Sequence, residues 1–93
     1  MRELDPLLHS QLRLAIVSLL LSVETADFVY LKEKTNATAG NLSVQLEKLE
    51  TAGYIQVKKE FVGKKTRTSC QLTDTGMKAL EDYIDALREY INL

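Results

Sequence analysis

The stretch from Thr38 to Gly53 constrains the fold of this chain more than any other. Leu42, Leu46 and Leu49 recur at spacings of four and three, which is the spacing of one buried face of a helix. Thr38 is placed to cap the start of this helix, and Gly53 is the residue type that often ends a helix in a left-handed conformation. These residues predict a helix with one buried face and an opposite face of mostly small, polar side chains.

Side chains of alternating polarity follow this helix directly. Ile55 and Val57 alternate with polar residues, which is the pattern of a strand with one face in water. After Gly63 the chain returns through a second alternating segment. The sequence therefore predicts a two-stranded hairpin with a basic tip at residues 63–67. The residues expected to anchor this hairpin to the core are Phe61, Thr68, Cys70 and Leu72.

Two further helices are predicted before residue 38. Asp5 followed by Pro6 is a helix-start signal, so the first helix is expected from about Pro6 to Leu21. The residues that follow leave room for a very short strand, after which Asp27 can cap a short helix from Phe28 to about Thr35. The segment TNAT then forms a turn, because asparagine and threonine hydrogen-bond locally and tolerate unusual backbone angles.

A long helix is expected from residue 75 or 76 to the end of the chain. Its apolar residues step by three, four, three and four, which is a heptad seam made of Met77, Leu80, Ile84, Leu87 and Ile91. This seam is shorter than the three or four heptads of a free coiled coil. The predicted fold is α+β and mostly helical, in a single domain of residues 1–93.

Positive charge is concentrated in the predicted hairpin. The formal net charge of the chain is −1, yet residues 58–67 hold five basic side chains and one acid, which gives this segment +4. The rest of the chain must therefore sum to −5. A local positive region in an acidic chain indicates an anionic partner that binds at that region.

The order of the elements predicts a DNA-binding fold. Two short helices joined by a tight turn, with small polar side chains on the second, match a helix-turn-helix whose second helix enters the major groove. A basic hairpin beside this pair would reach the neighbouring phosphates, as the wing of a winged helix does. The sequence thus predicts a winged helix-turn-helix that binds double-stranded DNA.

Two longer motifs carry a family resemblance. The segments TAGNLSVQLEKLETAGYIQVKKEFVGKKTRT and LTDTGMKAL resemble the small winged-helix transcriptional regulators related to the MarR and ArsR groups. With the first helix, the resemblance covers nearly the whole chain. It implies a homodimeric DNA-binding regulator without a separate ligand domain. Gln45 stands where these regulators often carry histidine, a difference that bears on base preference.

The predicted DNA contacts lie on the third helix and the hairpin tip. Thr38 and Ser43 suit phosphate contacts near a helix start, although Thr38 also serves as a cap. Asn41 and Gln45 can pair with base edges, adenine above all, and Val44 can touch a thymine methyl group. The basic tip is alternatively a charged, solvated hairpin edge. The predicted DNA-binding residues are Thr38, Gly40, Asn41, Ser43, Val44, Gln45, Lys48, Lys64, Lys65 and Arg67.

Surplus apolar surface on the first and last helices predicts a homodimer, with residues 75–93 as the dimerisation helix. The apolar residues of the first helix form a stripe wider than one buried face needs. An interaction module that binds proteins and not DNA is the alternative function. The predicted interface residues are Leu14, Val17, Leu21, Met77, Leu80, Tyr83, Ile84, Leu87, Tyr90 and Ile91.

Other functional classes find little support in the sequence. His9 has no histidine partner, the single Cys70 cannot form an internal disulfide, and no nucleophile elbow, phosphate-binding glycine loop or zinc-ligand spacing occurs. We expect no enzymatic activity, cofactor or metal. The longest apolar run has eight residues, so we expect a cytoplasmic protein that does not enter the membrane. A small-molecule effector is left open but is not indicated.

Overall fold

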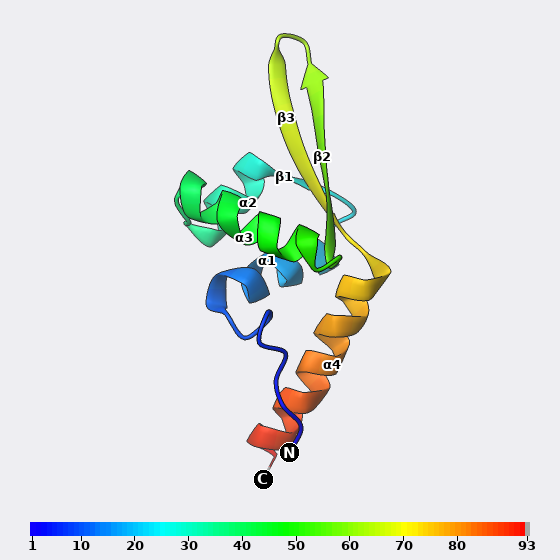
Figure 1. Ribbon diagram of the computed structural model, residues 1–93. Coiled ribbons are helices and arrows are strands. Elements are labelled where there is room, and N and C mark those ends of the chain that lie inside the picture. The colour runs from blue at the N-terminus through cyan, green and yellow to red at the C-terminus, as the bar shows by residue number, and fades with distance from the viewer. Residues whose placement is uncertain (93) are drawn as a thin grey trace.

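The computed structural model describes residues 1–92, which fold into four helices and three strands. Their order is α1 (Gln11–Leu21), β1 (Ala26–Asp27), α2 (Phe28–Thr35), α3 (Ala39–Thr51), β2 (Ile55–Val62), β3 (Lys65–Leu72) and α4 (Asp74–Ile91). Figure 1 shows α1 to α3 grouped at the centre, with the β2–β3 hairpin and α4 projecting in opposite directions. The molecule is therefore elongated, at 54 × 25 × 21 Å. The predicted winged helix-turn-helix is confirmed, and residue 93 of the predicted last helix lies outside the described residues.

Side-chain caps explain where three of the helices begin. Asp27 Oδ1 accepts a hydrogen bond from the Tyr30 amide at 2.8 Å, as predicted for the start of α2. Thr38 Oγ1 accepts one from the Asn41 amide at 3.1 Å, which confirms the predicted cap of α3. At α4 the cap is Thr73, so this helix begins at Asp74, one or two residues before the expected start. Local hydrogen-bond chemistry thus determines these boundaries.

The first helix begins at Gln11 and not at Pro6, which corrects the prediction. The Asp5 carboxylate accepts from the Leu7 amide at 2.9 Å, and the Asp5 carbonyl accepts from the His9 amide at 2.8 Å. These bonds close one separate turn. Ser10 then has an extended backbone, with φ −147° and ψ 128°, and caps α1 itself. The start signal at Asp5 is real but serves only a single turn.

The three strands form an antiparallel sheet in the order β1-β3-β2. Cys70 lies at its centre, paired with Ala26 on one side and Val57 on the other, and its side chain is buried as expected. Phe61, in contrast, is 79% exposed, so the prediction that it anchors the hairpin is wrong. Phe61 pairs with Thr66 near the tip, where the hairpin extends beyond the helices that would cover it. We call the β2–β3 hairpin the wing.

Part of the predicted dimer interface is buried in the core of the chain. Val17 is fully buried, Leu80 is 3% exposed and Tyr83 is 5% exposed. These three side chains pack against the core of their own chain, so their assignment to a dimer interface is corrected. The predicted seam of α4 is therefore divided, because Leu80 faces the core while Met77 and Ile84 remain about 40% exposed.

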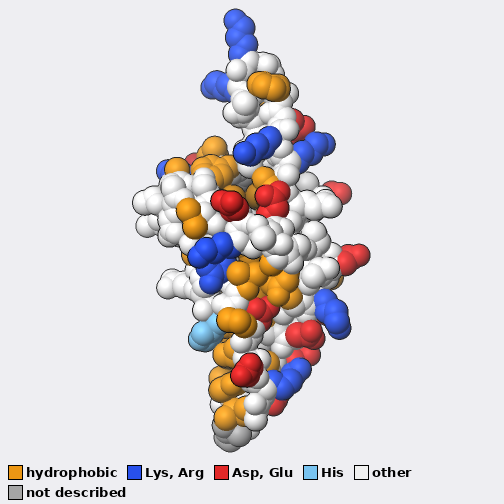
Figure 2. Space-filling model, in the orientation of Figure 1, with side chains coloured by type: hydrophobic (Ala, Val, Ile, Leu, Met, Phe, Trp, Pro, Cys, Tyr) orange, Lys and Arg blue, Asp and Glu red, His pale blue; other side chains and the backbone are white. Residues whose placement is uncertain are grey.

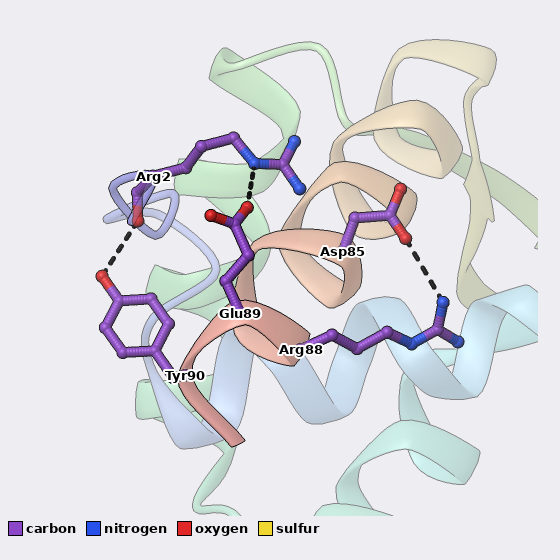
Figure 3. A network of polar contacts seen from close by, with 5 residues as sticks. All are labelled: Arg2, Asp85, Arg88, Glu89 and Tyr90. Carbon is purple, nitrogen blue, oxygen red and sulfur yellow. Dashed lines mark hydrogen bonds and ion pairs between the residues drawn. The ribbon is translucent and has the colours of Figure 1, made fainter. Parts of the chain in front are cut away.

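The N-terminal segment runs back along one side of α4 (Figure 3). Arg2 Nε donates to the Glu89 carboxylate at 2.6 Å, and the Tyr90 hydroxyl donates to the Arg2 carbonyl at 2.9 Å. The hydrogen bond from Arg2 lowers the pKa of Glu89. Further up, the Tyr54 hydroxyl donates to Asp5 at 2.5 Å, and burial together with this bond raises the pKa of Tyr54 to about 12. The segment thus covers the side of α4 that carries Glu89.

Candidate nucleic-acid interface

The third helix places the predicted DNA contacts outside the core. Leu42, Leu46 and Leu49 are buried and hold α3 against the rest of the domain. The predicted contact residues Thr38, Gly40, Asn41, Ser43, Val44 and Lys48 are exposed, while Gln45 is half-buried. No Cβ contact would arise at Gly40, so the backbone there is open to close approach. The start of α3 is thus an accessible polar surface.

The wing presents two free lysines at its tip. Gly63 has φ 66°, a left-handed angle that a residue with a side chain adopts only with strain, and it turns the chain between β2 and β3. Lys64 and Lys65 follow it, and both are exposed. Within residues 1–92 neither lysine forms an ion pair. Figure 2 shows blue basic side chains gathered around this end of the molecule.

Arg67 lies in a different environment from these two lysines. Its guanidinium is 3.6 Å from the carboxylate of Asp27, the same residue that caps α2. Both side chains are partly exposed, so the ion pair adds little stability, but it directs Arg67 toward the body of the domain. The predicted basic tip therefore divides into two free lysines and one engaged arginine.

Acidic side chains limit where DNA can lie. A groove between α3 and the wing is lined in part by Glu47, Glu50 and Lys59. The two carboxylates would repel phosphate. The first half of α3 and the tip of the wing are thus the exposed parts of these elements that carry no acidic side chain.

One residue that contacts the polar face of α3 from behind was missed by the sequence predictions. Arg13 of α1 donates through Nη1 to the side-chain oxygen of Gln45 at 2.5 Å, and Gln45 donates to Asn41 at 2.9 Å. Arg13 and Gln45 are 32 positions apart. No local pattern signals a contact over that distance, and Arg13 sits within an otherwise apolar helix stretch. The contact needs the packing of α1 against α3.

The thiol of Cys70 and the imidazole of His9 are both accounted for by packing within the domain. Burial, with a smaller contribution from Glu50, raises the pKa of the Cys70 thiol to about 11, so it stays protonated at neutral pH. His9 Nδ1 lies 3.1 Å from the Tyr83 hydroxyl on α4, which makes it a packing contact between the N-terminal segment and this helix. Across residues 1–92 no group of three or more histidine, cysteine, aspartate or glutamate side chains is placed to hold a metal. No helix in this part of the chain is long and apolar enough to cross a membrane.

Comparison with known families agrees with this geometry. A sequence profile described as a winged helix DNA-binding domain matches residues 12–91, which is most of the chain. The chain belongs to the winged helix DNA-binding family. The match runs from α1 to the end of α4 and so includes both α3 and the wing.

Several similar proteins show how far the likeness extends. An uncharacterised protein of Methanocaldococcus jannaschii is 40% identical over 76 residues, which is 82% of this chain and 83% of the relative. A transcriptional regulator homologue from Pyrococcus horikoshii has a TM-score of 0.84 and 28% identity, covering 92% of this chain and 85% of its own. PadR of Bacillus subtilis, solved in complex with operator DNA, has a TM-score of 0.71 and 23% identity, covering 81% of this chain and 48% of PadR. The likeness to PadR shows the shared fold.

Proposed function

We propose that this winged helix protein is a sequence-specific, double-stranded DNA-binding transcriptional regulator that acts as a homodimer. The observation that carries the proposal is the pairing of an exposed polar α3 start with two lysines at the wing tip that form no ion pair among residues 1–92. The Pyrococcus horikoshii regulator homologue, which is similar over nearly the whole chain, supports this function. The proposal includes a MarR- or ArsR-like mode of action in the cytoplasm, in a single domain of residues 1–93.

Each part of the surface has a distinct task in this proposal. Lys64 and Lys65 neutralise phosphates beside the groove that α3 enters. Thr38 and Ser43 contact phosphates near the start of α3, where the partial positive charge of the helix favours anions. Val44, which is 48% exposed, is available to a thymine methyl group. The acidic remainder of the molecule favours this orientation over others.

Selection of bound duplexes from a random pool tests DNA recognition. We expect enrichment of two inverted half-sites with centres about one helical turn, roughly 34 Å, apart, because a two-fold symmetric dimer presents two α3 helices. Binding is read by fluorescence anisotropy of the enriched duplex against a scrambled one. Failure to enrich any sequence would contradict the proposal.

An exposed apolar stripe on α4 supports the homodimer. Glu89 and Tyr90, which contact the N-terminal segment, lie at least about a quarter of a turn from this stripe at about 100° per residue. The N-terminal segment therefore leaves the stripe uncovered, and Figure 2 shows hydrophobic side chains along this lower end of the molecule. The stripe consists of Met77, Ile84 and Ile91, which are 40%, 39% and 71% exposed. The other residues retained in the proposed interface are Leu14, Leu21, Leu87 and Tyr90.

Ile84→Asp is expected to convert the dimer into a monomer. A carboxylate at the middle of the stripe would be buried without a partner in the dimer, which is strongly unfavourable. Light scattering should report twice 10.5 kDa for the wild type and 10.5 kDa for the variant. Val29→Asp is the matched control, because Val29 is also apolar and 61% exposed but lies on α2. A wild type that is already 10.5 kDa at micromolar concentration would remove the dimer from the proposal.

A protein-interaction module is the second candidate function. The observation that favours it is the apolar pair Phe61 and Val62 on the wing, which are 79% and 55% exposed. Such side chains can enter a partner protein as well as a DNA groove. The duplex selection separates the two functions, because an interaction module enriches no sequence.

A further inference from the structure

We propose that Arg13 fixes the side-chain amides of Gln45 and Asn41 as hydrogen-bond donors toward DNA, so that α3 selects guanine over adenine. This inference rests on the proposed DNA-binding function. It gives a residue outside the helix-turn-helix a role in specificity. Arg13 acts as a positioning residue, since its contacts lie within the protein.

The contacts form a continuous relay from α1 to the surface of α3. Arg13 Nε donates to the Leu7 carbonyl at 2.6 Å, and its Nη1 donates to Gln45 Oε1 at 2.5 Å. Gln45 Nε2 then donates to Asn41 Oδ1 at 2.9 Å. Arg13 and Gln45 are half-buried, whereas Asn41 is exposed. The relay is therefore anchored at its inner end and open at its outer end.

The chemistry of arginine determines the direction of this relay. A guanidinium group has only donors, so Gln45 must turn its oxygen toward Arg13 and its NH₂ group away from it. The NH₂ group of Gln45 in turn donates to Asn41, whose side-chain oxygen accepts the hydrogen bond. Because the oxygen of Asn41 faces Gln45, both N–H groups of the Asn41 amide point away from Gln45. The outer end of the relay is consequently a double donor.

A double donor distinguishes the two purines. An asparagine or glutamine pairs with adenine by accepting from N6 and donating to N7, which needs a free amide oxygen. In the relay the oxygen of Gln45 is turned toward Arg13 and that of Asn41 toward the NH₂ group of Gln45, so neither oxygen is directed outward to accept from N6. Guanine presents two acceptors, N7 and O6, in the major groove, and these match two donated N–H groups. The adenine preference expected from the residue types alone is thereby reversed.

Duplex selection with the wild type and Arg13→Met tests the base preference. For the wild type we expect guanine to be favoured over adenine by roughly tenfold at one position of each half-site. Arg13→Met should lose this preference, because Gln45 and Asn41 can then rotate. Arg88→Met is the matched control: it also removes one guanidinium, but that group pairs with Asp85 on α4 at 3.4 Å. It should keep the wild-type preference.

A second variant guards against a folding defect, since Arg13 also binds the Leu7 carbonyl. Gln45→Met breaks the relay while leaving that bond in place, and it should move the preference toward adenine through the freed oxygen of Asn41. An adenine preference in the wild type would overturn the inference. So would a guanine preference that survives in both Arg13→Met and Gln45→Met.

Nuclear magnetic resonance of the free protein tests the relay without DNA. The side-chain NH₂ protons of Gln45 should exchange with water more slowly than those of the exposed Gln11 and Gln56. This protection should be lost in Arg13→Met. Equal exchange of the three glutamines in the wild type would overturn the relay. If the relay is present but no duplex is bound, the proposed function fails and the geometry stands.

Discussion

Gly76→Ala is expected to lower the free energy of unfolding by about 3 kcal/mol, the upper end of the usual cost of overpacking. A Cβ atom at this position would overlap the carbonyl oxygen of Tyr54 and lie 2.9 Å from the carbonyl carbon. It would also lie 2.8 Å from Leu72 Cδ1. Two of these three atoms belong to backbone, which cannot rotate away.

Hydrogen bonds hold that backbone in place. The Tyr54 carbonyl accepts from the Thr73 amide at 3.0 Å. The Thr73 hydroxyl donates to the Gly53 carbonyl at 2.6 Å and accepts from the Gly76 amide at 3.0 Å. The first turn of α4 is thus fastened to the base of the wing. A shift large enough to accept a methyl group would break this set of bonds.

Urea unfolding followed by circular dichroism measures the effect. Gly40→Ala is the matched control, because a Cβ at Gly40 would meet no atom within 4 Å apart from its chain neighbours and the backbone of its own helix. Alanine is favoured over glycine inside a helix by up to about 1 kcal/mol, so this variant should be neutral or more stable. Wild-type stability of Gly76→Ala would mean that α4 does not dock on the Tyr54 carbonyl.

Features of the fold that depend on residues close together in the sequence were largely predictable. The leucine spacing of α3, its Thr38 cap and its Gly53 end are all local signals, and the structure confirms them. The start of α1 was not predictable in this way, because Asp5 and Ser10 are both suitable caps. Which of two caps begins the helix depends on how the preceding turn packs against the body of the domain.

Features that depend on distant segments could not be predicted. Heptad spacing identifies an apolar face on α4, but it does not show that Leu80 is buried in the core whereas Ile84 is exposed. This division depends on which side of α4 meets the core formed by the other elements. The candidate site shows the same limit: Lys64 and Lys65 are exposed as charge density suggested, whereas the pairing of Arg67 with Asp27 needs β1 beside β3. Contact of these residues with DNA stays a prediction.

Lys64→Ala/Lys65→Ala is expected to weaken the salt dependence of DNA binding. Each phosphate contact contributes about −0.9 to the slope of log affinity against log salt, so two lysines on each of two wings account for about −3.6. Between about 50 and 200 mM salt, the affinity of the variant should therefore change about a hundredfold less than that of the wild type. Anisotropy titrations at several salt concentrations measure both slopes.

A matched double variant separates wing contacts from total charge. Lys78→Ala/Arg88→Ala removes the same two charges, but both residues lie on α4, which projects away from the wing (Figure 1). Its slope should remain that of the wild type. Arg67→Ala should reduce the slope by less than one lysine does, because its guanidinium already pairs with Asp27. If the α4 variant lowers the slope as much as the wing variant, net charge and not the wing governs binding.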